Sequence, residues 1–347
     1  MKHRRSRSIG VLLTPALALS GMILAWTVNL FVGFPVGVAL SQTEDLHNAF
    51  RQKELDTTRN PSESSTVTTS QSLKVNVNLV LVPVTVTDGM NRVVLGLGKE
   101  HFQVYQDKQL QSVQTFSSAD VPVSVGIIFD TSGSMVTKTG RARQAVVEFT
   151  KMANPEDEFF LIAFADRPID LVDFTPSAEE VTNSLLFARP QGSTALLDAI
   201  YLGIAKMHRA TYTKKALLII SDGGDNHSRY SDKDVKRLVK ESDVMIYAIG
   251  VYDTYFPTEE ERLGPELLSD ICDLSGGGSF AIDNPNDLPD VASKIGMELH
   301  NQYVLGYRPN RATSHGKWHK IRVKLLAPKG FPQLRVSAKE GYYDRAD

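Results

Sequence analysis

The feature that most constrains the fold of this chain is a regular alternation of strand-like and helix-like segments between Val121 and about His300. Short runs rich in β-branched and aromatic residues are typical of buried parallel strands. These runs are VSVGIIFD, DEFFLIAFAD, KKALLIISD and VMIYAIGVYD. Apolar residues recur at helical spacing in the segments between them, RARQAVVEFTKMA, ALLDAIYLGIAKMHRA and SDKDVKRLVKESD. The alternation predicts an α/β domain over residues 121–302, with a doubly wound, mostly parallel sheet.

The end of this region follows the same pattern. ELLSDICDLSGGGSFAI predicts a helix that is stopped by Gly276, Gly277 and Gly278 and is followed by a last edge strand. NDLPDVASKIGMELHNQY predicts a final helix.

Two further segments, 75–120 and 303–347, predict β-strands. Residues 75–117 alternate between apolar and polar side chains, with a turn at Asp88-Gly89 and a hairpin turn at Asp107-Lys108. YVLGY, WHKIRVKLLA and QLRVSAKEGYY predict strands after the last helix. Neither segment has enough strands to close a sandwich. We therefore expect the two to pack together as one β-sandwich-like domain, with the α/β domain inserted between them.

The N-terminus predicts export. Several basic residues precede a long apolar segment from Ile9 to about Leu40, and small residues lie near Ser41. Residues 1–41 are either a signal peptide or an uncleaved anchor in the inner membrane, and both readings stay open. The rest of the chain would then be periplasmic or extracellular. Residues 42–74 are polar and lack apolar periodicity, which predicts a disordered linker.

The composition argues against nucleic acid as a partner. The formal net charge is −2, and no basic stripe is visible in the sequence. The single cysteine, Cys272, cannot form an internal disulfide. We expect it to be packed in a helix.

Hydroxyl and carboxylate side chains follow the predicted strands where ligands of doubly wound sheets bind, at the carboxyl ends. Asp130 ends the first strand, and Ser132 and Ser134 follow it at alternating positions. Thr194 precedes a predicted helix, and Asp222 ends the predicted strand LLIIS in the run KKALLIISD. Oxygen donors without His or Cys suit Mg²⁺, or alternatively Mn²⁺ or Ca²⁺.

Each of these residues has a simpler explanation when taken alone. Serines after a strand are often turn residues, Thr194 would cap its helix, and Asp222 would form a turn at Gly223. A common site is favoured because all of them fall on one predicted rim of the sheet, which is formed by the carboxyl ends of the strands and the helix starts that face them.

The motifs DTSGSM, GST and ISDGGDN resemble the metal-ion-dependent adhesion site of von Willebrand factor type A domains. The resemblance covers about half the chain. It implies that the hydroxyls of Ser132 and Ser134 ligate the metal, and that Thr194, Asp130 and Asp222 do so directly or through water. The flanking β segments, with LVPVTVTD, FQVYQD, LGYRP and EGYY, also resemble an exported family of type A domain proteins from acidobacteria.

Two carboxylates neutralise a divalent metal only partly when several ligands are uncharged hydroxyls. The expected partner is therefore a protein that presents an Asp or Glu carboxylate to the metal. Contact with a membrane is expected only through the N-terminal segment. If exposed, the residues that would surround the bridging acid are Met135, Val136, Lys138, Asp225, Asn226, His227 and Arg229.

Enzymatic readings fit less well, and no enzyme activity is expected. A Mg²⁺-dependent phosphotransferase of the haloacid dehalogenase type uses Asp-x-Asp after the first strand, whereas Ser132 stands at the second position here. The sequence has no Gly-x-Ser-x-Gly elbow and no His-Glu-x-x-His pair. The remaining alternative is a metal-free structural or scaffold protein of the cell envelope.

Overall fold

The structure is a computed structural model that describes residues 79–252, 259–282, 284–309, 316–327, 330 and 333–344. The predicted signal peptide or anchor (1–41) and the predicted linker (42–74) lie outside these residues. Within the described part of the chain, no helix combines the length and the hydropathy that a membrane span requires.

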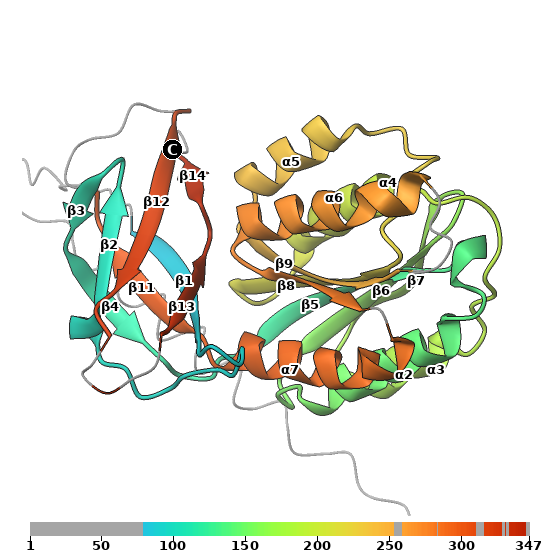
Figure 1. Cartoon of the computed structure of the whole chain (residues 1–347), viewed down its shortest axis with the longest axis horizontal. Coiled ribbons are helices and arrows are strands. Elements are labelled where there is room, and N and C mark those ends of the chain that lie inside the picture. The colour runs from blue at the N-terminus through green and yellow to red at the C-terminus, as the bar shows by residue number, and fades with distance from the viewer. Residues whose placement is uncertain are drawn as a thin grey trace, which may run out of the picture. The chain divides into compact units, whose positions relative to one another are not determined.

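The predicted α/β fold class is confirmed. Six strands form one sheet in the order β10-β9-β8-β5-β6-β7 (Figure 1). All neighbouring pairs are parallel except β6 and β7. The strands are β5 (Val123–Asp130), β6 (Glu158–Phe164), β7 (Pro168–Thr175), β8 (Lys214–Ser221), β9 (Val244–Val251) and β10 (Gly278–Ile282). Every residue of β5 and of β9 is buried, as expected for strands with both faces covered.

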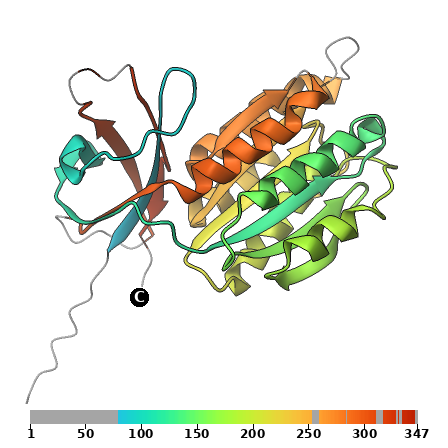
Figure 2. The same cartoon turned by 90° about the horizontal axis from the view of Figure 1, so that it is seen from below.

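Helices cover both faces of this sheet (Figures 1 and 2). One face packs against α2 (Thr139–Lys151), α3 (Ala178–Leu185) and α7 (Leu288–His300). The other face packs against α4 (Leu196–Lys206), α5 (Asp232–Glu241) and α6 (Glu259–Ser275). Figure 2 shows α2 and α7 side by side. Short 3₁₀ helices complete the described elements: η1 (Lys99–His101), η2 (Gly133–Met135), η3 (Met207–Arg209) and η4 (Pro285–Asp287).

Two elements were not anticipated from the sequence, β7 and α3. Strand β7 lies at the sheet edge, antiparallel to β6, and Val172 is its one fully buried residue. Its sequence PIDLVDFT therefore lacks the continuous apolar run of the central strands. Helix α3 has only eight residues and starts at Ser177, whose hydroxyl accepts a hydrogen bond from the Glu180 amide.

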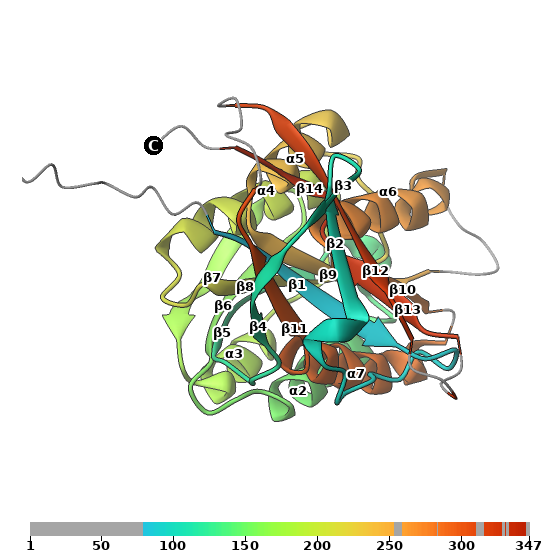
Figure 3. The same ribbon diagram turned by 90° about the vertical axis from the view of Figure 1, so that its left-hand side faces the viewer.

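The β segments build two antiparallel four-stranded sheets, ordered β13-β1-β11-β4 and β14-β12-β2-β3 (Figure 3). Strand β1 pairs with β11 and β13, and β2 pairs with β12, so both sheets join strands from before and after the α/β domain. QLRVSAKEGYY divides into β13 and β14, which belong to different sheets. The strands are β1 (Val80–Thr87), β2 (Phe102–Gln106), β3 (Gln109–Gln111), β4 (Val113–Ser117), β11 (Tyr303–Tyr307), β12 (Trp318–Leu325), β13 (Arg335–Ala338) and β14 (Gly341–Tyr343).

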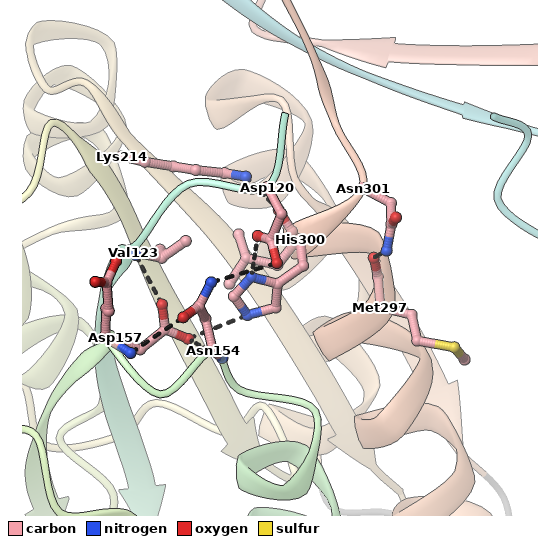
Figure 4. Close-up of polar contacts among 10 residues, drawn as sticks. Asp120, Val123, Asn154, Asp157, Lys214, Met297, His300 and Asn301 are labelled. Atoms are coloured by element: carbon pink, nitrogen blue, oxygen red, sulfur yellow. Dashed lines mark hydrogen bonds and ion pairs between the residues drawn. The ribbon is translucent and has the colours of Figure 1, made fainter. Parts of the chain in front are cut away.

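A buried histidine lies where the chain passes between the β strands and the α/β domain (Figure 4). The His300 Nδ1 atom is 2.9 Å from Asp120 Oδ1, and its Nε2 atom is 3.1 Å from Asp157 Oδ2. Asp157 also accepts a 2.8 Å hydrogen bond from the Val123 amide at the start of β5. His300 thus connects the end of α7 to the entry of the central strand.

Candidate metal centre

The predicted site lies at the switch point of the α/β sheet. From β5 the chain crosses to β6 on one side of that strand, and it later returns through β8 on the other side. Asp130 is the last residue of β5, and Asp222 follows β8 directly. The carboxyl ends of strands on either side of a switch point form the usual ligand crevice of an open α/β sheet.

The loop after β5 turns back on Asp130. The Ser132 amide donates a 2.8 Å hydrogen bond to Asp130 Oδ1, and the Ser132 and Ser134 hydroxyl oxygens are 3.1 Å apart. Ser132 is buried, whereas Ser134 is exposed. The loop therefore gathers one carboxylate and two hydroxyls, and Ser134 lies on its solvent side.

Backbone contacts hold the Thr194 loop against both neighbours. The Gly133 amide donates to the Gly192 carbonyl at 3.0 Å. On the other side, the Thr194 amide donates to Asn226 Oδ1 at 2.9 Å, and the Thr194 carbonyl accepts from the Asn226 amide at 3.0 Å. The loops that carry Ser132, Thr194 and Asp222 thus adjoin one another, as the sequence predicted.

Asp222 is followed by a backbone turn that only glycine accommodates easily. Gly223 has a φ of +77°, and a Cβ at this position would lie 2.9 Å from the Gly264 Cα atom. The Gly223 amide donates to the Ser221 hydroxyl at 3.0 Å. Asp222 therefore leaves the strand on a tightly packed turn, with its own side chain only 1% exposed.

The electrostatics of the site are dominated by buried carboxylates. Burial raises the pKa of Asp130 to about 7, and the neighbouring Asp222 carboxylate contributes to the increase. Hydrogen bonds from Ser132 and Ser221 oppose this shift. Bringing two carboxylates together in a buried place is unfavourable unless positive charge balances them.

A lysine ammonium lies at one of these carboxylates. Lys138 Nζ is 3.3 Å from Asp222 Oδ2, and the Lys138 side chain is 9% exposed. From its sequence position, Lys138 was expected among the residues that would meet a partner if exposed. In the structure the Lys138 side chain is buried instead.

The other rim candidates divide into exposed and structural residues. Met135 is fully buried in the core between the sheet and α2, so it cannot contact a partner. Asp225 is half-buried and accepts a 3.1 Å hydrogen bond from the Leu197 amide at the start of α4. Arg229 is exposed but donates through Nε to Asp198. The candidates that are exposed are Val136, Asn226, His227 and Arg229.

Two polar residues that shape the site, Ser221 and Asp198, were not among the candidates predicted from the sequence. The Ser221 hydroxyl donates a 2.5 Å hydrogen bond to Asp130 Oδ2, joining the ends of β8 and β5. Asp198 is 5% exposed and accepts hydrogen bonds from the Arg229 and Tyr230 amides, at 2.8 and 3.1 Å. The sequence did contain a signal for Asp198, because a carboxylate is unusual within the otherwise apolar helical segment ALLDAI.

The donor set fits a hard divalent cation such as Mg²⁺. Among the described residues, no three His, Cys, Asp or Glu side chains form a group that could hold a metal ion. A cation here would depend on hydroxyls in addition to the two carboxylates. The residues that would hold it are Asp130, Ser132, Ser134, Thr194 and Asp222.

Residues 125–224 match the model of the von Willebrand factor type A domain family. This segment contains all five predicted metal-binding residues. No curated protein matches the chain.

Solved structures that are similar to part of this chain include three from bacteria. The chain is 16% identical to the conserved hypothetical protein BatB from Bacteroides thetaiotaomicron, over 51% of this chain and 98% of that one, with a TM-score of 0.42. It is 13% identical to a von Willebrand factor type A protein from Catenulispora acidiphila, over 79% and 76% of the respective chains, with a TM-score of 0.46. It is 13% identical to the vWF domain of the type V pili tip protein Mfa5 from Porphyromonas gingivalis, over 56% and 99%, with a TM-score of 0.40.

Proposed function

We propose that this chain is an exported protein-binding module whose site at Asp130 and Asp222 takes up Mg²⁺, or alternatively Mn²⁺ or Ca²⁺. A bound cation would supply positive charge that is open to an Asp or Glu carboxylate of a partner protein. Ser132, Ser134 and Thr194 would hold the same cation through their hydroxyls. Neither nucleic acid nor catalysis is part of the proposal.

The observation that carries this proposal is the pairing of two buried carboxylates at the switch point, with hydroxyls on the adjoining loops. Asp130 and Asp222 are 0% and 1% exposed, and they come from strands that lie side by side. Such an arrangement disfavours two negative charges unless a cation joins them. The match to the type A domain model over 125–224 supports the same site.

The exposed side of the site supports a binding role. Ser134, Asn226 and His227 are exposed around it. They would contact a partner beside the proposed metal. The proposed location outside the cytoplasmic membrane depends on the N-terminal segment 1–41 alone.

A metal-free scaffold is the second candidate, and one observation favours it. Lys138 already provides a positive charge at Asp222, 3.3 Å away. The metal-binding and scaffold proposals differ in whether added Mg²⁺ changes the stability of the protein.

Thermal unfolding with and without Mg²⁺ tests the proposal. The compact segment 74–347 should unfold at a higher temperature with Mg²⁺. The gain is about 2.7 kcal/mol at a hundred times the Kd if only the native state binds. The Asp222→Ala variant should lose this gain, because one of the two charged ligands is gone.

The matched control is Asp243→Ala. Asp243 is an exposed aspartate directly before β9, so it lies at the amino ends of the parallel strands and not at the carboxyl ends that form the predicted site. It should keep the full Mg²⁺ response. Equal responses in the Asp222→Ala variant and the wild type would refute the assigned residues. A wild type without any response would favour the scaffold.

The carboxylate-binding step needs its own measurement. With Mn²⁺ as the probe, water proton relaxation reports coordination positions that are open to solvent. Adding acetate should lower the enhanced relaxation, because a carboxylate would displace bound water. Unchanged relaxation at saturating Mn²⁺ would restrict the metal to a structural role.

A further inference from the structure

Lys138 occupies an unusual place for a cation. It is the N-cap residue of α2 and makes no side-chain capping hydrogen bond there. The N-terminus of a helix carries partial positive charge, so a lysine is unfavourable at this position unless an anion compensates. Asp222 supplies that anion from the end of β8, 84 residues further along the chain.

The Lys138 ammonium is buried together with its partner. The side chains of Lys138 and Asp222 are 9% and 1% exposed. Lysine is rarely buried unless it is paired, and the ion pair with Asp222 is one reason why the Lys138 side chain can be buried here. The ammonium group contacts the carboxylate of Asp222, which is one of the two charged ligands of the proposed metal site.

We propose that Lys138 is a built-in cation that neutralises Asp222 in the metal-free protein and competes with a metal ion for this carboxylate. The inference rests on the proposed function, because it concerns the same site. Lys138 would have to leave Asp222 when the site takes up a divalent ion, since two cations at one carboxylate repel each other strongly in a buried place. Lys138 therefore lowers the metal affinity and keeps the empty site stable.

Replacing Lys138 by an uncharged side chain of similar length tests this competition. The Lys138→Met variant should bind Mg²⁺ at least about tenfold more tightly than the wild type by isothermal titration calorimetry, because no ammonium has to be displaced. In the presence of EDTA the same variant should unfold at a lower temperature, because Asp222 has lost its counter-charge. Added Mg²⁺ should restore the unfolding temperature.

The matched control is Lys151→Met, at the other end of α2, where the lysine is exposed and pairs with Glu148. Its affinity for Mg²⁺ should equal that of the wild type. Lys138→Arg keeps the positive charge and should remain a weaker metal binder than Lys138→Met. If Lys138→Met does not fold without metal, Lys138→Gln provides the same comparison with a polar side chain.

The possible outcomes separate this inference from the proposed function. If the wild type binds Mg²⁺ and neither Lys138→Met nor Lys138→Gln binds more tightly, the competition is refuted while the metal site stands. If only the neutral variants bind Mg²⁺, the competition is confirmed and the native chain is a metal-free protein. If none of them binds, both the inference and the metal-dependent function are wrong.

Discussion

Replacing Gly277 with alanine should destabilise the protein by about 3 kcal/mol, an amount typical of overpacking in a core that cannot adjust. A Cβ at Gly277 would lie 2.0 Å from the carbonyl oxygen of Ile246 and 2.7 Å from its carbonyl carbon. Both are backbone atoms near the start of β9, which is hydrogen-bonded to β8 and β10. No side-chain rotation can relieve the contact, so the end of α6 would have to move away from the sheet.

The measurement is urea unfolding of the variant beside Gly140→Ala. Gly140 lies in the first turn of α2, and a Cβ there would meet nothing within 4 Å. This control should stabilise the protein by up to about 1 kcal/mol, because alanine favours the helix over glycine. A Gly277→Ala variant that is as stable as the wild type would mean that the turn between α6 and β10 does not approach β9 as closely as described.

Replacing His300 with glutamine should cost about 3 kcal/mol near pH 6, as expected when one partner of a buried ion pair is removed. His300 is 7% exposed and lies between the carboxylates of Asp120 and Asp157. Burial lowers its pKa, but the hydrogen bonds to Asp157 and Asp120 outweigh burial, and the pKa lies above the ordinary value. The protonated imidazole therefore stabilises the connection between α7 and β5 shown in Figure 4.

The sign of the pH dependence follows from this shift. A histidine whose pKa is raised on folding stabilises the native state fully below its unfolded pKa, about 6.5, and loses this contribution as the pH rises through the folded value. Another charged group nearby is Lys214, at the start of β8, which is attracted by the same Asp120 and Asp157 carboxylates. Burial lowers the pKa of Lys214 to about 8, so the comparison is cleanest below that pH.

The stability difference between wild type and His300→Gln should therefore be larger at pH 6 than at pH 7.5, as measured by urea unfolding. The matched control is His208→Gln, which changes an exposed histidine in η3 and should alter stability little at either pH. A difference that is constant with pH, or larger at pH 7.5, would show that His300 is neutral in the native protein.

The order of the elements was accessible from the sequence because it depends on local periodicity. The buried strands β5, β6, β8 and β9 are continuous apolar runs, and the helices between them carry apolar residues at helical spacing. Strand β7 was not predicted, because an edge strand with one fully buried residue does not have a continuous apolar run in its sequence. The hairpin at Asp107-Lys108 was confirmed, and both residues adopt positive φ there.

The sequence by itself predicted that Asp130, Ser132, Ser134, Thr194 and Asp222 would lie on one rim. Parallel strands expose their carboxyl ends at one edge of a sheet, and the helices between them begin at the same edge, so a position directly after a strand or, for Thr194, directly before a helix suffices. Only the tertiary structure decided that Ser221 donates to Asp130 and that Lys138 reaches Asp222, over 91 and 84 residues of chain. Such contacts depend on how α2 and the strand ends pack, because the direction of a side chain relative to distant residues has no periodic signal in the sequence.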